Sequence, residues 1–184
     1  MENLELVLPE VFISLSIMFL LILGVFKKNS SKLIQNISLI VLLITAVIIF
    51  NETLGIEETR LFSGSIIIDY FSSFMKILTL LAAFLVLVIS SNYLKTLKIF
   101  KIEYSILILS SVLGMMIMIS SNDLIVFYMG LELQSLALYV LATFNRDEIK
   151  SSEAGLKYFV LSALSSGLLL YGCSLIYGFT GSTN

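Results

Sequence analysis

The chain has 184 residues, of which 58% are hydrophobic and 13% charged, with a net charge of −2 and a mean hydropathy of +1.03. Soluble domains are about 45–50% apolar and about 25% charged, so this composition excludes a water-soluble protein. Histidine is absent and cysteine occurs once, as Cys173, which excludes haem, zinc and iron–sulfur sites that need several such ligands. We therefore expect no metal and no cofactor on this chain.

Six apolar segments are each long enough to cross a bilayer, which takes about 20 helical residues. The polar stretches between them are too short to bury a core of their own. The sequence thus predicts an all-α, polytopic bundle of about six transmembrane helices that forms one membrane domain over residues 1–184. The predicted spans are 8–26, 33–50, 66–93, 104–120, 122–144 and 152–177.

Basic residues gather in every second loop. The loops after the first, third and fifth spans are rich in Lys and Arg, whereas Arg60 is the only basic residue in the loops on the other side. By the positive-inside rule the basic loops face the cytoplasm or matrix, and both termini face the outer, periplasmic or intermembrane, side. The basic residues assigned to the inner side are Lys27, Lys28, Lys32, Lys95, Lys98, Lys101, Arg146, Lys150 and Lys157.

One carboxylate, Glu132, lies near the middle of the fifth span. A charge at this depth costs at least about 2.5 kcal/mol, and no residue of the same span offsets that cost. We favour a proton-handling or ion-handling role, because acids inside membranes are rare and usually functional. The alternative is a neutral glutamate that is hydrogen-bonded inside the bundle.

Lys157 is the candidate partner of Glu132. The rise per residue of a helix puts the two about 9 Å apart along the bundle axis. This is too far for direct contact, but a long lysine side chain and one or two waters can bridge it. Equally, Lys157 can extend to the inner headgroups, and the sequence leaves both interpretations open.

The third span contains Asp69 near its outer end and Lys76 deeper inside. Asp69 is expected at the interface. Lys76 can neutralise an acid on another helix, or it can extend outward to the headgroups; we favour the second.

The sixth span has small residues at helical spacing, Ser162 with Ser166 and Ala163 with Gly167. This pattern predicts close packing against another helix.

Two blocks carry a resemblance to a known family: GMMIMISSNDLIVFYMGLELQSLALYVLATF (114–144) and SSEAGLKYFVLSALSSGLLLYGCSLIYGFTGST (151–183). Both resemble subunit N of bacterial respiratory complex I, called subunit 2 in mitochondria. This complex is the proton-translocating NADH:ubiquinone oxidoreductase. The opening LPE and the IDYFSSFMK block fit the family more loosely.

The resemblance implies an antiporter-like fold, in which an acid of the fifth span and a lysine of a following helix couple quinone chemistry to proton movement. It puts Glu132 at the position of that acid and Lys157 at the lysine of the EAxxKY block, so both are expected to serve proton translocation. NADH, flavin, iron–sulfur clusters and quinone are expected on other subunits. The implied partners are other membrane-arm subunits and membrane lipids, with no nucleic acid.

Family members usually have more than twice as many spans, so the resemblance implies the N-terminal part of such a module. We expect a split subunit that a second chain completes, with a truncated structural remnant as the alternative. A subunit of a multi-subunit cation/proton antiporter is a further alternative, against which the ELQSL pattern (132–136) argues. The residue usage favours a mitochondrial inner membrane over a bacterial plasma membrane.

Overall fold

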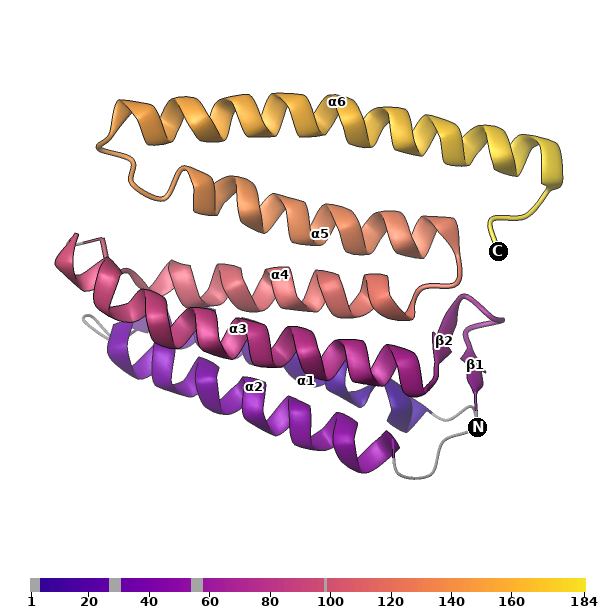
Figure 1. Cartoon of the computed structure of the whole chain (residues 1–184), viewed down its shortest axis with the longest axis horizontal. Coiled ribbons are helices and arrows are strands. Elements are labelled where there is room, and N and C mark those ends of the chain that lie inside the picture. Colours follow the sequence, from indigo (N-terminus) through magenta and orange to yellow (C-terminus); the bar gives the residue numbers. More distant parts are fainter. Residues whose placement is uncertain (1–3, 27–30, 54–57, 98) are drawn as a thin grey trace.

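The structure, a computed structural model, describes residues 4–26, 31–53, 58–97 and 99–184. These residues form six long helices that lie side by side and alternate in direction (Figure 1). All six are long and apolar enough to cross a membrane, which confirms the predicted all-α membrane bundle. The elements are η1 (Leu4–Val7), α1 (Leu8–Phe26), α2 (Ser31–Thr53), β1 (Thr59–Leu61), β2 (Ile66–Ile68), α3 (Tyr70–Thr96), α4 (Ile102–Ser120), α5 (Leu124–Ala142) and α6 (Ile149–Thr180).

The third predicted span begins too early. Ile66–Ile68 form β2, which pairs antiparallel with β1, because consecutive β-branched residues favour an extended strand. Helix α3 starts only after Asp69, whose side chain accepts a hydrogen bond from the Ser72 backbone N–H at 2.7 Å. The Ser72 hydroxyl in turn accepts one from the Asp69 backbone N–H at 2.9 Å. This reciprocal capping box fixes the start of the helix.

The apolar core lies among α1, α2, α3 and α4. Among the described residues, the main cluster of buried apolar side chains takes its members from these four helices. Helices α5 and α6 form a second layer, with α5 against α4 and α6 at the edge of the bundle (Figure 1). The largest fully buried side chains of the core are those of Ile13, Leu20, Ile34, Leu42, Leu80, Leu87, Leu109 and Met116.

Helices α4 and α5 approach each other through two glycines. A Cβ atom added to Gly130 would lie 2.9 Å from the carbonyl oxygen of Gly114, and one added to Gly114 would lie 2.7 Å from the carbonyl oxygen of Gly130. Small residues allow helix backbones this close in a membrane. The contact fixes the rotation of α5, because Gly130 must face α4.

Helix α6 is the least covered helix. Of its described residues only Gly155 and Cys173 are buried, and its most apolar 18-residue window is 6% buried. No described residue of this chain makes the packing predicted from its small residues at Gly167, which has no atom within 4 Å of an added Cβ, or at Ala163, which is exposed. Helix α6 instead contacts α5 mainly at its inner end, where Gly155 packs against Thr143.

The residues that follow α6 return to the turn between α4 and α5. Thr183 donates its hydroxyl to the Asp123 carboxylate at 2.5 Å, and its carbonyl oxygen accepts the Leu124 backbone N–H at 2.9 Å. Asn122 donates to the carbonyl oxygen of Gly64, in the turn between β1 and β2, at 2.8 Å. The hairpin, the α4–α5 turn and the last residues therefore share one end of the bundle (Figure 1), which positive-inside counting assigns to the outer side.

Candidate functional site: charged side chains inside the bundle

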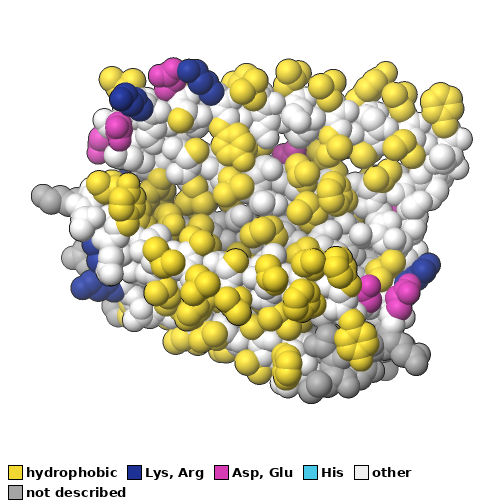
Figure 2. Space-filling view, viewed as in Figure 1, with side chains coloured by type: hydrophobic (Ala, Val, Ile, Leu, Met, Phe, Trp, Pro, Cys, Tyr) yellow, Lys and Arg dark blue, Asp and Glu magenta, His cyan; other side chains and the backbone are white. Residues whose placement is uncertain are grey.

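Glu132 lies on the side of α5 that faces away from α4. It follows Gly130 by two residues, and two residues rotate a helix by about 200°, so its side chain points toward the α6 side. One carboxylate oxygen, Oε1, is buried and has no hydrogen-bond partner among the described residues. Figure 2 shows acidic atoms in the middle of the apolar face, between α5 and α6. This is an ionisable group at mid-membrane depth with an oxygen free to bind a proton.

Polar side chains continue along the same face of α5. Tyr128, Glu132, Ser135 and Tyr139 follow one another at spacings of three or four residues, which places them on one side of a helix. The Tyr139 hydroxyl donates a hydrogen bond to the Ser162 hydroxyl of α6. Sequence analysis missed this stripe, although its three- and four-residue spacing was the available signal.

The Tyr139 ring is also enclosed by aromatic side chains of α6. It makes edge-to-face contacts with Tyr158 at 4.9 Å and with Phe159 at 5.6 Å between ring centroids. Such pairs add to the stabilisation from burial. The contact between α5 and α6 is thus concentrated two helical turns inward of Glu132.

The structure does not bring Lys157 to Glu132. Within the described part of the chain, the Lys157 ammonium pairs with Glu153, one turn earlier on α6, at 2.5 Å. Both side chains are more than half exposed, 68% and 54%. Gly155 lies level with Thr143 near the inner end of α5, and the helical rise then separates Lys157 from Glu132 by roughly 14 Å along the axis. This exceeds the separation expected from sequence, because α6 begins at Ile149 and Gly155, in its second turn, is the residue level with the inner end of α5.

Lys76 occupies a buried ion pair. Its ammonium lies 2.6 Å from Glu10 Oε1, and the two side chains are 3% and 12% exposed. The favoured prediction, that Lys76 extends outward to the headgroups, is therefore wrong, and the alternative of an acid on another helix is correct. A buried lysine needs such a counter-charge because desolvation of a lone charge is costly. The second Glu10 oxygen is buried and unpaired among the described residues.

Three of the basic residues assigned to the inner side, Lys27, Lys28 and Lys98, lie outside the described residues. In the described ranges, no group of three or more Asp, Glu or Cys side chains is placed to hold a metal ion. Glu132, Glu10 and Lys76 are ionisable side chains that these helices hold at buried or partly buried positions.

These features define an integral membrane helix bundle with ionisable side chains inside the bilayer, an arrangement typical of ion and proton pathways. Residues 121–184 match the family described as NADH:quinone oxidoreductase/Mrp antiporter, TM. Over its whole length the chain is similar to proteins described as NADH-quinone oxidoreductase subunit N.

Sequence identity is high in bacterial relatives. The chain is 68% identical over 184 residues to subunit N of Pelagibacter ubique and 50% identical over 179 residues to that of Paramagnetospirillum magneticum. These matches cover 100% and 97% of this chain but 39% and 36% of the relatives. The chain thus spans under two fifths of the length of the relatives that it matches.

Solved structures show the same fold. A chain of respiratory complex I from Thermus thermophilus superposes with a TM-score of 0.80 at 26% identity, covering 95% of this chain and 38% of that one. The archaeal membrane-bound sulfane sulfur reductase and the Mrp complex of a Dietzia species give TM-scores of 0.76 and 0.74, at 24% and 22% identity. These two matches cover 98% and 99% of this chain, and 38% and 36% of the respective solved chains. These last two likenesses concern the fold alone.

Proposed function

We propose that the chain contributes part of an antiporter-like proton-translocation module in the membrane arm of a proton-pumping NADH:quinone oxidoreductase. The observation that carries this proposal is the Glu132 carboxylate, which lies at mid-membrane depth with one buried, unpaired oxygen. The similarity to subunit N supports this assembly as the one in which such an acid would work. NADH oxidation and quinone reduction would take place on other subunits, and this chain would bind and pass protons.

Glu132 would act by changing its protonation state. A charged carboxylate in this apolar layer is unfavourable unless a positive charge or water approaches it. A cation that arrives from elsewhere in the module would stabilise the charged form, and its departure would favour uptake of a proton. Lys157 would act at the inner side, where its pairing with exposed Glu153 keeps it close to water.

A complete module would need helices beyond the six described here, because the relatives are much longer than this chain. We propose that such helices, together with neighbouring membrane-arm subunits, pack against α6. The nearly uncovered apolar surface of that helix supports this placement. The named relatives are bacterial, which favours a bacterial plasma membrane over the mitochondrial membrane expected from residue usage.

A subunit of a multi-subunit cation/proton antiporter is the second candidate. The likeness to the Mrp complex and the shared family description favour it, whereas the high identity to subunit N favours the first candidate. The two differ in energy source, since only the first would couple proton movement to NADH oxidation.

The test uses the native assembly isolated from membranes and reconstituted into vesicles, with subunits identified by mass spectrometry. We expect NADH oxidation to drive proton movement in the wild type. Glu132→Gln should lower the proton pumping rate by at least about tenfold, and Glu132→Asp should retain part of it. Glu58→Gln is the matched control, because it removes an exposed acid just before β1, at the outer end of the bundle. Unchanged pumping in Glu132→Gln, or an assembly without NADH oxidation, would contradict the proposal.

A further inference from the structure

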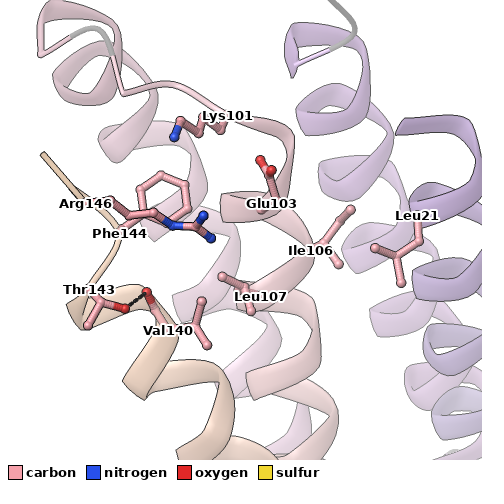
Figure 3. A pocket seen from close by; sticks show the side chains of 9 residues that line it. All are labelled: Leu21, Lys101, Glu103, Ile106, Leu107, Val140, Thr143, Phe144 and Arg146. Atoms are coloured by element: carbon pink, nitrogen blue, oxygen red, sulfur yellow. Dashed lines mark hydrogen bonds between the residues drawn. The ribbon is translucent and has the colours of Figure 1, made fainter. Parts of the chain in front are cut away.

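A cavity of about 240 Å³ opens at the basic end of the bundle, between α1, α4 and α5 (Figure 3). Its polar residues lie at or beyond the helix ends, and its apolar residues other than Phe144 lie farther along the helices, toward the middle of the bundle. The cavity therefore has the polarity of an amphiphile that is inserted in the inner leaflet. Its lining residues are Leu21, Lys101, Glu103, Ile106, Leu107, Val140, Thr143, Phe144 and Arg146.

The charged rim of the cavity has a net charge of +1. Lys101 and Arg146 supply two cations, and Glu103 supplies one acid. None of the three forms an ion pair within the described residues. Figure 3 shows the three charged groups on the same side of the cavity, beyond the side chains of Leu107 and Val140. These cations are available to an anion from outside the chain.

The N-terminus of α4 adds to this positive rim. Lys101 is the N-cap residue of α4, and it makes no side-chain capping hydrogen bond. The first backbone N–H groups of a helix lack partners within the helix, and they attract anions such as phosphate. The rim thus combines two side-chain cations with an uncapped helix end.

We propose that this cavity binds an anionic phospholipid of the inner leaflet. Its phosphate would lie between Lys101, Arg146 and the N-terminus of α4, and the start of an acyl chain would lie against Leu107 and Val140. Basic pockets between membrane helices on the cytoplasmic side favour anionic headgroups. A headgroup with one net negative charge complements the net charge of the rim, whereas a zwitterionic headgroup would leave one positive charge uncompensated. The inference does not depend on the proposed function.

The test measures lipid binding to the purified, delipidated full chain in detergent by native mass spectrometry. Dioleoyl-phosphatidylglycerol, dioleoyl-phosphatidylethanolamine and dioleoyl-phosphatidylcholine are added at equal concentrations. We expect phosphatidylglycerol to bind most tightly. The double substitution Lys101→Gln/Arg146→Gln should weaken its binding about 30-fold, from the usual contribution of two cations near a membrane surface.

Two further variants separate a specific site from general charge attraction. Lys32→Gln/Lys150→Gln removes two exposed cations from the same side outside the cavity and should bind phosphatidylglycerol like the wild type. Val140→Trp fills the apolar part without changing charge and should weaken binding of this lipid. Equal binding of all three lipids, or an equal loss in the control variant, would overturn the proposal.

Discussion

The ammonium of Lys76 donates a hydrogen bond to Glu10 Oε1 at 2.6 Å and thereby joins α3 to α1 inside the bundle. Both side chains are almost fully removed from solvent. Removal of one member of a buried pair leaves the other charge uncompensated, whereas replacement of both by neutral groups is often nearly neutral. The pair is therefore expected to be strongly coupled.

We predict that Lys76→Met lowers the free energy of unfolding by about 3–5 kcal/mol and that Glu10→Gln/Lys76→Met recovers most of this loss. Thermal unfolding of the purified variants in detergent measures both. Lys32→Met, at an exposed position of α2, controls for loss of a lysine alone. A double variant as unstable as Lys76→Met would show that Glu10 is not the relevant partner.

The close approach of α4 and α5 gives a second prediction. In Gly130→Ala the new Cβ would meet backbone atoms of Gly114 and Met118 at 2.9 Å, and backbone cannot move aside as a flexible side chain can. Overpacking of this kind costs about 1–3 kcal/mol. Gly167→Ala, with no atom within 4 Å, is the matched control and should be neutral or slightly stabilising. Equal unfolding temperatures for the two variants would argue against the close contact.

The hydrogen bond between Tyr139 and Ser162 gives a third prediction. Tyr139→Phe removes the hydroxyl but keeps the ring against Tyr158 and Phe159, so it should cost about 1 kcal/mol. Tyr139→Ala also removes the ring, and it should cost about 3–5 kcal/mol. Denaturant unfolding distinguishes the two. A similar cost for both would mean that the ring contacts contribute little to the α5–α6 interface.

Asp123 gives a pH-dependent prediction at the outer end. The hydrogen bond from Thr183 is the largest cause that lowers the pKa of Asp123, with smaller contributions from the Ile125 and Val126 backbone N–H groups, and burial opposes them. Because this pKa is lowered, the charged form of Asp123 stabilises the fold at pH values above its unfolded pKa of about 3.9. This stabilisation is lost as the pH falls through the pKa of the folded state.

We therefore expect the segment 181–184 to stay docked at neutral pH and to loosen in acid. Amide hydrogen exchange of Leu124, whose N–H is bound by the Thr183 carbonyl, reports this docking. Thr183→Val should raise the pKa of Asp123 and move the loosening to higher pH. The link would be refuted if the protection factor of the Leu124 amide, which compares its exchange rate with that of an unfolded chain at the same pH, did not change with pH. It would also be refuted if this protection factor were the same in Thr183→Val.

Apolar runs and loop charges predicted the six helices, because each span alone must be apolar enough to enter a bilayer. Except for the start of α3, each helix begins and ends within three residues of its predicted bounds. That exception has a local cause. Hydropathy does not distinguish an apolar strand such as Ile66–Ile68 from the first turn of a helix, and only the Asp69 cap marks the start of α3.

Partners of the charged residues were harder to predict, because pairing depends on how far one helix is shifted along another. Lys76 and Glu10 are 66 positions apart, and nothing local to either residue indicates that they meet. For Lys157 the shift of α6 relative to α5 decided the outcome, and the loop between them does not reveal that shift. Glu132 needed no such knowledge, since its depth follows from its own helix.

The location of the apolar core bears on biogenesis. Helices α1 to α4 contain the main cluster of buried apolar residues and, in a chain made from its N-terminus, emerge from the ribosome first. This four-helix unit can consequently assemble before α6 is synthesised. Helix α6 then enters the bilayer against one preformed neighbour, α5, and depends on whatever lipid or protein meets its other side. Of the six helices, α6 is thus the one whose placement depends most on contacts made after α1 to α4 have packed.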